Sequence, residues 1–186
     1  MIGELPSFLI VNNKQRAIRS DFRTALIIFQ AFNDIELNEY EKTMVLLKCL
    51  YVDFKEFTEA EYREAIDQAC IFLDGGKEYS SEENKSKVID WEQDEQMIFS
   101  AINKVAGCET RAKRYIHWWT FLGYFNEIGE GLLSTVINIR QKKSKGKKLE
   151  KYEQDFYRNN KDIINLKQKY TQEEQKEIDR LNSLLN

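Results

Sequence analysis

The chain has 186 residues, which is enough for one domain with a hydrophobic core and short for two. Apolar residues make up 42% of it and charged residues 32%, a composition typical of a soluble globular protein rather than a disordered chain. Its 28 basic and 31 acidic residues nearly cancel to a net charge of −3, so composition predicts neither a nucleic-acid footprint nor strong attraction to anionic membranes.

Cysteine usage and apolar runs indicate a cytosolic protein. Cys49, Cys70 and Cys108 are widely spaced and odd in number, which predicts reduced thiols rather than a disulfide framework or a structural zinc site. The N-terminus lacks the features of a signal peptide, and no stretch approaches about 18 consecutive apolar residues. In such a protein the tripeptide Asn84-Lys85-Ser86 is not expected to be glycosylated.

The chain is predicted to begin with a β-hairpin and to continue as helices. The segments FLIV (8–11) and QRAI (15–18) flank an Asn-Asn turn, a sequence typical of two short antiparallel strands. From Ser20 the apolar residues follow a helical period, with Ser20 as the expected N-cap. A single proline, Pro6, leaves the helices uninterrupted.

Start and stop signals divide the next part of the chain. Asn38 is expected to cap a second helix, and Thr58 with Glu61 forms a capping-box pattern that opens a third. Gly75-Gly76 is expected to end that helix, because glycine tolerates the left-handed backbone at a helix C-terminus. Residues 77–87 are polar throughout and predict an exposed loop.

Three more helices are predicted in the following segment. A fourth is expected from about Asp90 to Gly107, a fifth over about 110–128, and a sixth from about Leu132. A narrow apolar stripe continues through 152–170, and a capping pattern at Thr171 predicts a last helix.

The predicted fold class is therefore mainly α, with an N-terminal β-hairpin followed by a helical bundle of about six to eight helices. Residues 1–149 are expected to form a single helical domain with the hairpin. Residues 150–186 are expected to form C-terminal helices that either pack on this domain or extend from it.

The aromatic stretch YIHWWTFLGYF at 115–125 contains the chain's one histidine, His117. On a helix at 100° per residue, Trp118 lies inside an apolar arc, Trp119 flanks it, and His117 lies at its edge next to Tyr124. A catalytic histidine needs a nucleophile and an orienting group, and no motif in the sequence supplies them. We therefore expect a structural histidine, and no metal site around it.

The stretch DWEQDE at 90–95 holds four carboxylates. Asp90 and Asp94 are four residues apart and would share a helix face, so an acid/base pair is conceivable. Acidic residues in a first helical turn also complement the helix dipole, and Asp90 is a good N-cap residue. We favour this structural interpretation.

The basic run RQKKSKGKK at 140–148 raises a nucleic-acid hypothesis. It contains no aromatic residue on which bases could stack, so a solvated loop is the favoured interpretation. The chain is 12% aromatic, and its C-terminal segment has an apolar stripe that needs a cover. These features favour protein binding.

Several segments, in order, carry a family resemblance: SDFRTALIIFQAF, LNEYEKTMVLLKCLY, VIDWEQDEQMIFSAINKV, YIHWWTFLGYFNEI and FYRNNKDIINL. On these the chain resembles the bacteriophage gene-product-fifteen family, small proteins of tailed phages and prophages of Gram-positive bacteria. The resemblance covers about residues 3–170. The segment LLSTVINIRQKK departs from the glycine-containing turn usual in the family, and residues 171–186 lie beyond the matched part.

The resemblance implies a tail assembly protein of the chaperone type. Such a protein keeps the aggregation-prone tape-measure protein soluble in the host bacterial cytoplasm while the tail tube polymerises. Further partners it implies are the major tail protein or a longer tail assembly protein, and self-association is compatible with it. It implies no enzymatic activity, cofactor or metal. The alternative is a small regulatory or nucleic-acid-binding phage protein that acts through the basic run 140–148.

The candidate structural or interaction residues are Asp90, Trp91, Asp94, His117, Trp118, Trp119, Tyr124, Phe156 and Tyr157. We expect most of these aromatics to be architectural, with Trp91 holding its segment against the 115–125 helix. Trp119 and Tyr124, at the edges of the arc, are the residues expected to remain available for contact. Client binding is expected in an adjacent groove or on the C-terminal helices.

Overall fold

The computed structural model describes residues 3–77 and 87–184. The tripeptide Asn84-Lys85-Ser86 and all but the two ends of the loop predicted at 77–87 lie outside the described residues.

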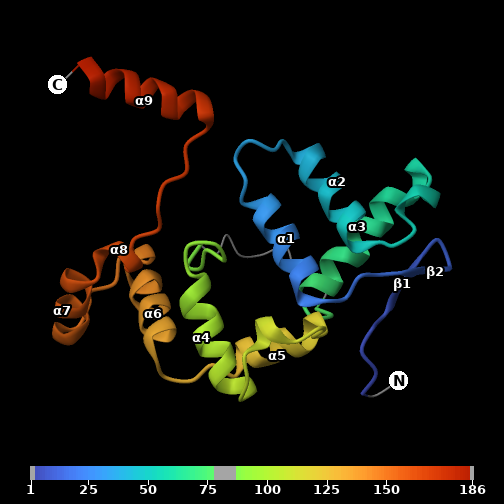
Figure 1. Ribbon diagram of the computed structural model, residues 1–186, viewed down its shortest axis with the longest axis horizontal. Helices are drawn as coiled ribbons and strands as arrows, with labels where there is room; N and C mark the ends of the chain where they lie inside the picture. Colours follow the sequence, from blue (N-terminus) through green and yellow to red (C-terminus); the bar gives the residue numbers. More distant parts are fainter. Residues whose placement is uncertain (1–2, 78–86, 185–186) are drawn as a thin grey trace.

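Within the described residues the chain forms a two-stranded antiparallel sheet and nine α-helices (Figure 1). This confirms the predicted fold class. The elements are β1 (Phe8–Val11), β2 (Lys14–Ala17), α1 (Phe22–Phe32), α2 (Glu39–Leu50), α3 (Glu59–Leu73), α4 (Glu95–Ala106), α5 (Trp118–Asn126), α6 (Leu132–Ser144), α7 (Lys151–Asn159), α8 (Lys161–Ile164) and α9 (Gln172–Leu184), with 3₁₀ turns η1 (Phe54–Glu56) and η2 (Thr110–Ala112).

The hairpin forms where the Asn-Asn turn predicts it. Val11 pairs with Lys14, and both residues of the two-residue turn have positive φ, 52° for Asn12 and 56° for Asn13. Two successive left-handed residues define the mirror-image turn that matches the twist of antiparallel strands, and asparagine tolerates this conformation.

Most predicted helix ends are also confirmed. The Asn38 side chain caps α2 together with Glu41, and the Glu61 carboxylate accepts from the backbone N–H of Thr58 at the start of α3. Gly76 has φ 89° and donates to the carbonyl of Ile71, which closes the end of α3. The prediction for Ser20 was wrong by one residue, because Asp21 accepts from the N–H of Arg23 and caps α1 instead.

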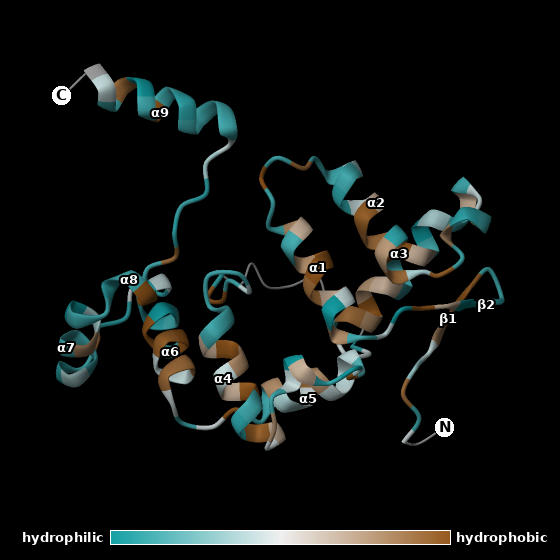
Figure 2. Cartoon of the chain, in the orientation of Figure 1, coloured by the Kyte–Doolittle hydropathy of each residue, from teal (hydrophilic) through white to brown (hydrophobic). Residues whose placement is uncertain are grey.

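The main hydrophobic core lies among α1 to α5 (Figures 1 and 2). At its centre the rings of Phe22 and Phe121 stack with centroids 4.4 Å apart, and Phe99 packs edge-on against Phe22 at 6.1 Å. A smaller cluster of Val136, Ile139 and Ile164 joins α6 to α8. The two clusters meet where α4 contacts α6.

One buried ion pair links the two clusters. The Arg140 guanidinium on α6 binds both carboxylate oxygens of Asp94, at 2.5 and 2.9 Å, and Asp94 is fully buried. The same guanidinium donates to the carbonyls of Val88, Ile163 and Ile164. Since every N–H of this arginine has an acceptor, α6, α8 and the segment before α4 are held around one charged group.

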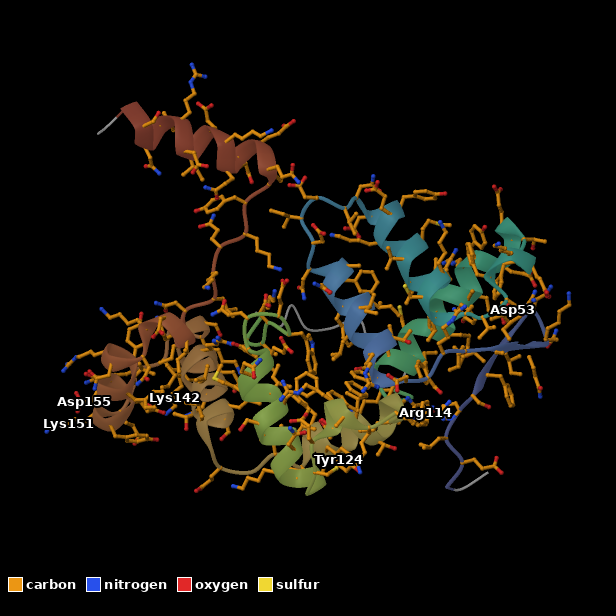
Figure 3. All side chains as sticks on the ribbon, viewed as in Figure 1. Asp53, Arg114, Tyr124, Lys142, Lys151 and Asp155 are labelled. Carbon is orange, nitrogen blue, oxygen red and sulfur yellow. The ribbon has the colours of Figure 1, made fainter. Side chains whose placement is uncertain are left out.

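The basic run 140–148 matches the predicted solvated loop only over residues 145–148, which are exposed and lie outside any helix. Residues 140–144 complete α6, and Arg140 is buried. Lys142 lies between α6 and α7, where its ammonium is 2.6 Å from the carboxylate of Glu153 (Figure 3). Hydrophobic periodicity misses this arrangement because the run contains no apolar residue to mark its inner face.

The C-terminal segment divides into two parts. Both α7 and α8 pack close to α6, whereas α9 lies apart from the body of the molecule (Figure 1). Among residues 3–77 and 87–184, no helix is both long and apolar enough to cross a membrane.

We predict that Asp94→Ala strongly destabilises the protein, by about 3–5 kcal/mol, because it leaves the Arg140 charge buried without a partner. Urea unfolding followed by circular dichroism measures this loss. Lys148→Ala removes an exposed charge of the same basic run and is the control, with an expected change within about 0.5 kcal/mol. Equal stability of the two variants would contradict the role given to the ion pair.

Candidate functional site

The histidine and its neighbours lie at the start of a helix rather than within one. The helix predicted over 110–128 begins only at Trp118, so the placement of Tyr115 and His117 on a helical arc was wrong. The N–H of Phe22 donates to the carbonyl of Ile116 (3.0 Å), and the N–H of Trp118 donates to that of Ser20 (2.7 Å). These long-range hydrogen bonds hold the residues before Trp118 in an extended conformation.

His117 is the N-cap of α5 and is only 4% exposed. Its Nδ1 accepts from the N–H of Trp119 at 3.0 Å, and its Nε2 lies 3.0 Å from the carbonyl oxygen of Pro6. The ring that satisfies both contacts is neutral, with the proton on Nε2. Both ring nitrogens are thus engaged in structural hydrogen bonds. The described part of the chain holds no cluster of three or more histidine, cysteine or carboxylate side chains placed to bind a metal.

The two tryptophans after His117 hold the end of α3. The indole N–H of Trp118 donates to the carbonyl of Leu73 at 2.9 Å, and that of Trp119 donates to the carbonyl of Phe72 at 2.8 Å. The Phe72 carbonyl also accepts from the N–H of Gly75, whereas a carbonyl in a last helical turn, such as that of Leu73, has no intrahelical partner, so the Trp118 bond satisfies it. Gly76 has φ 89°, a conformation that favours glycine, and a Cβ there would lie 3.1 Å from the Trp119 ring, which is a tight contact.

The other aromatic candidates also contact elements of this chain. Tyr124 is partly buried against the main core. Phe156 packs on the smaller cluster, and the ring of Tyr157 lies 3.8 Å below the ammonium of Lys143 while its hydroxyl meets Asn165. These contacts give the residues architectural positions, and the client contact expected of Trp119 and Tyr124 stays a prediction.

The two aspartates of DWEQDE lie in and at the end of a turn rather than along a helix. Because α4 begins at Glu95, the prediction that Asp90 opens this helix was wrong. Asp90 instead accepts from the N–H groups of Glu92 and Gln93, and Asp94 accepts from the N–H of Asp90. Burial raises the pKa of Asp90, but Lys87 and these N–H groups outweigh it and lower the value to about 2.

This turn places Trp91 between α1 and α5. Its ring stacks on Phe29 of α1 at 6.0 Å and contacts Phe125 and Trp118 of α5, with centroids 5.3 and 6.5 Å away. The predicted contact between this segment and the 115–125 region is therefore present.

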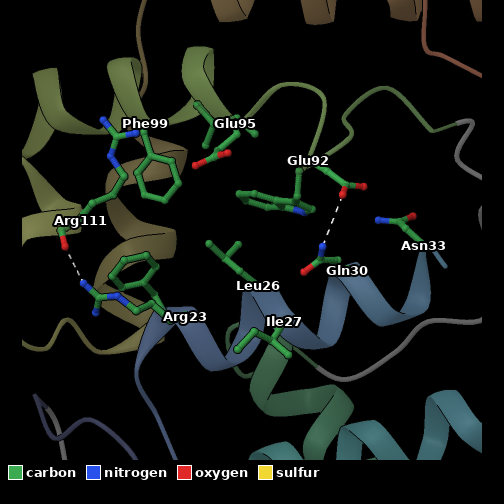
Figure 4. A pocket seen from close by; sticks show the side chains of 12 residues that line it. Arg23, Leu26, Ile27, Gln30, Asn33, Glu92, Glu95, Phe99 and Arg111 are labelled. Carbon is green, nitrogen blue, oxygen red and sulfur yellow. Dashed lines mark hydrogen bonds between the residues drawn. The ribbon is translucent and has the colours of Figure 1, made fainter.

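One side of Trp91 faces an open groove of about 320 Å³ between α1 and α4, which we call the α1–α4 groove (Figure 4). Phe22, Ile98 and Phe99 belong to the core beneath it, and Leu26 and Ile27 of α1 border it. Ile27 is 53% exposed although it is aliphatic. Concave apolar surfaces of this kind are the usual form of binding sites.

The two ends of the groove are polar. Arg23 and Arg111 lie at one end, where each guanidinium lies over a ring, that of Phe22 at 4.5 Å and that of Phe99 at 5.0 Å (Figure 4). At the other end the Gln30 amide meets the Glu92 carboxylate at 3.4 Å, beside Asn33. The polar ends limit the apolar surface to the middle of the groove.

An adjacent groove was expected, but its lining was not predicted, because it comes from three separate segments of the chain. The sequence does contain one signal. Ile27 lies about 140° from Phe22 on a helical projection, opposite the apolar arc that Phe22 forms with Leu26 and Phe29. An aliphatic residue opposite a complete apolar arc indicates a second apolar surface on the helix.

These features define a mainly helical protein whose candidate site is a groove for binding rather than a cluster of reactive groups. The family model described as Bacteriophage Gp15 protein matches residues 1–166, so the chain belongs to this family. Membership indicates a bacteriophage protein related to structure or assembly of the particle. No match is found among curated proteins or among solved structures.

We predict that His117→Ala lowers the free energy of unfolding by about 1–2 kcal/mol, through loss of the cap on α5 and of the bond to Pro6. His117→Asn keeps a side-chain acceptor at the N-cap and should lose less. Chemical unfolding of both variants measures the difference. An asparagine variant as unstable as the alanine variant would show that the cap contributes little.

Proposed function

We propose that this protein is a tail assembly chaperone that binds the tape-measure protein in the host bacterial cytoplasm and keeps it soluble until the tail tube forms around it. It acts by binding and not by catalysis. In this proposal the α1–α4 groove receives apolar side chains from a helix of the client, and the polar ends of the groove limit where that helix can lie.

The observation that carries the proposal is an exposed apolar groove in a member of a phage protein family. A tape-measure protein is long and helical, and a groove between two helices is a recurring way to bind an amphipathic helix. The volume of about 320 Å³ is at the lower end of ordinary binding pockets, so the groove suits a few side chains of one helical turn.

The contacts of the basic run support client binding over nucleic-acid binding. Arg140 binds Asp94, Lys142 binds Glu153, and Lys143 lies over the ring of Tyr157. These three charges are partly neutralised or shielded by groups of this chain, which reduces the positive surface open to phosphates.

We predict that co-expression with the tape-measure protein yields a soluble complex of defined mass that survives high salt. Apolar association persists as ionic strength rises, whereas phosphate contacts weaken steeply. Size-exclusion chromatography with light scattering measures the mass. If the tape-measure protein precipitates while this protein elutes free, direct client binding is excluded.

The groove itself is tested by Ile27→Glu. This change places a charge on its apolar wall and should weaken client binding by about 10- to 100-fold, the equivalent of losing one buried aliphatic side chain. Val52→Glu is the matched control, because Val52 is 54% exposed and lies outside the groove. Equal binding by the two folded variants would place the client site elsewhere.

A further inference from the structure

The segment that leads into α9 is attached at one end of the α1–α4 groove. The ammonium of Lys169 lies 2.8 Å from the carboxylate of Glu92, and the N–H of Lys167 donates to the side chain of Gln93 at 2.9 Å. Three residues after Lys169, the N–H of Gln172 donates to the Glu36 carboxylate at 2.5 Å. The first residue of α9 is therefore held close to the C-terminal end of α1, on the side where Glu92 and Asn33 close the groove.

The helix that follows has an apolar stripe that is only partly covered, since Ile178 is half-buried. Ile178 and Leu181 are three residues apart and share one face of α9, and Leu181 is 52% exposed. The rest of the described helix is almost entirely polar (Figure 2). A helix of 13 residues is marginal in water unless it packs against something, so this stripe requires a surface.

The groove matches α9 in length and in polarity. At 1.5 Å per residue, the 13 residues of α9 span about 20 Å and the 11 residues of α1 about 16 Å. A helix that starts at the Asn33 end and runs antiparallel to α1 ends beside Arg23 and Arg111. Cations stabilise the negative end of a helix dipole, but Arg23 and Arg111 already pair with Asp21 and Glu109, so the dipole favours that direction only weakly.

We propose that α9 closes over the α1–α4 groove of its own chain by turning about residues 170–172, with Ile178 and Leu181 packed against Ile27. The arrangement in Figure 1 is the open position of this lid. The anchors at Lys167 and Lys169 stay in place during closure, because they lie before the turning point. Where the groove is also the client site, which rests on the proposed function, the client and α9 compete for it.

Hydrogen exchange of the full chain without any client tests the lid. Amides in the second half of α9 should exchange roughly tenfold or more slowly in the wild-type protein than in Leu181→Glu or Ile27→Glu, since an unpacked helix of this length is weakly protected. Ser183→Glu is the matched control. It adds the same charge to the same end of α9 on the opposite face and should keep the protection.

Two results would overturn the proposal. One is exchange in α9 that is equally fast in the wild-type protein and both groove-directed variants. The other is protection that rises with protein concentration together with the mass in light scattering, because the occupant would then be a second copy. Because the exchange experiment contains no client, a result that contradicts the lid does not contradict the proposed function. In the same way, a failure to bind the tape-measure protein does not contradict the lid.

Discussion

The Arg140–Asp94 ion pair holds the two hydrophobic clusters of the molecule together. A buried charge is costly to remove from water, and here its cost is offset because both carboxylate oxygens and three backbone carbonyls accept from one guanidinium. Asp94 also holds the backbone of Asp90, and the turn between them presents Trp91 to the core and Glu92 to the groove. The groove therefore depends on a bond made at the N-terminal end of α4.

The aromatic side chains also hold distant segments of the chain together. Trp118 and Trp119 each combine a packed ring with an N–H bond to the end of α3, so they connect elements that are far apart in sequence. An amphipathic ring with one donor is suited to such a junction, since it buries apolar area and satisfies a carbonyl at once. The high aromatic content that suggested an exposed binding surface is thus used largely inside the fold, and at the groove Trp91 shares the apolar surface with the exposed aliphatic side chain of Ile27.

Most turns and helix ends were predictable from the sequence, whereas the starts of α1, α4 and α5 and the long-range contacts were not. The Asn-Asn turn, the caps at Asn38 and Thr58, and the glycine stops depend on neighbours within a few residues, and all were found. The starts of α4 and α5 were wrong because bonds to Asp90 and to residues 20–22 replaced helical ones. The sequence did not indicate that Arg140 is buried while the lysines beside it are not. Its burial depends on a bond to Asp94, which lies 46 residues away in the chain.

Helix α9 lies outside the matched family segment, and the proposed lid gives it a physical role. The family match ends at residue 166, before α9 begins. A tethered helix meets its groove at an effective concentration on the order of millimolar, so even a weak contact keeps an apolar groove covered. Because the contact between α9 and the groove is weak, a ligand that binds the groove more strongly displaces the helix. A ligand shifts the equilibrium between the closed and open lid only by its difference in affinity for the two states. A short, mostly polar helix with two apolar contacts at its centre satisfies both requirements, since it shields Ile27 from other copies of the chain without closing the groove permanently.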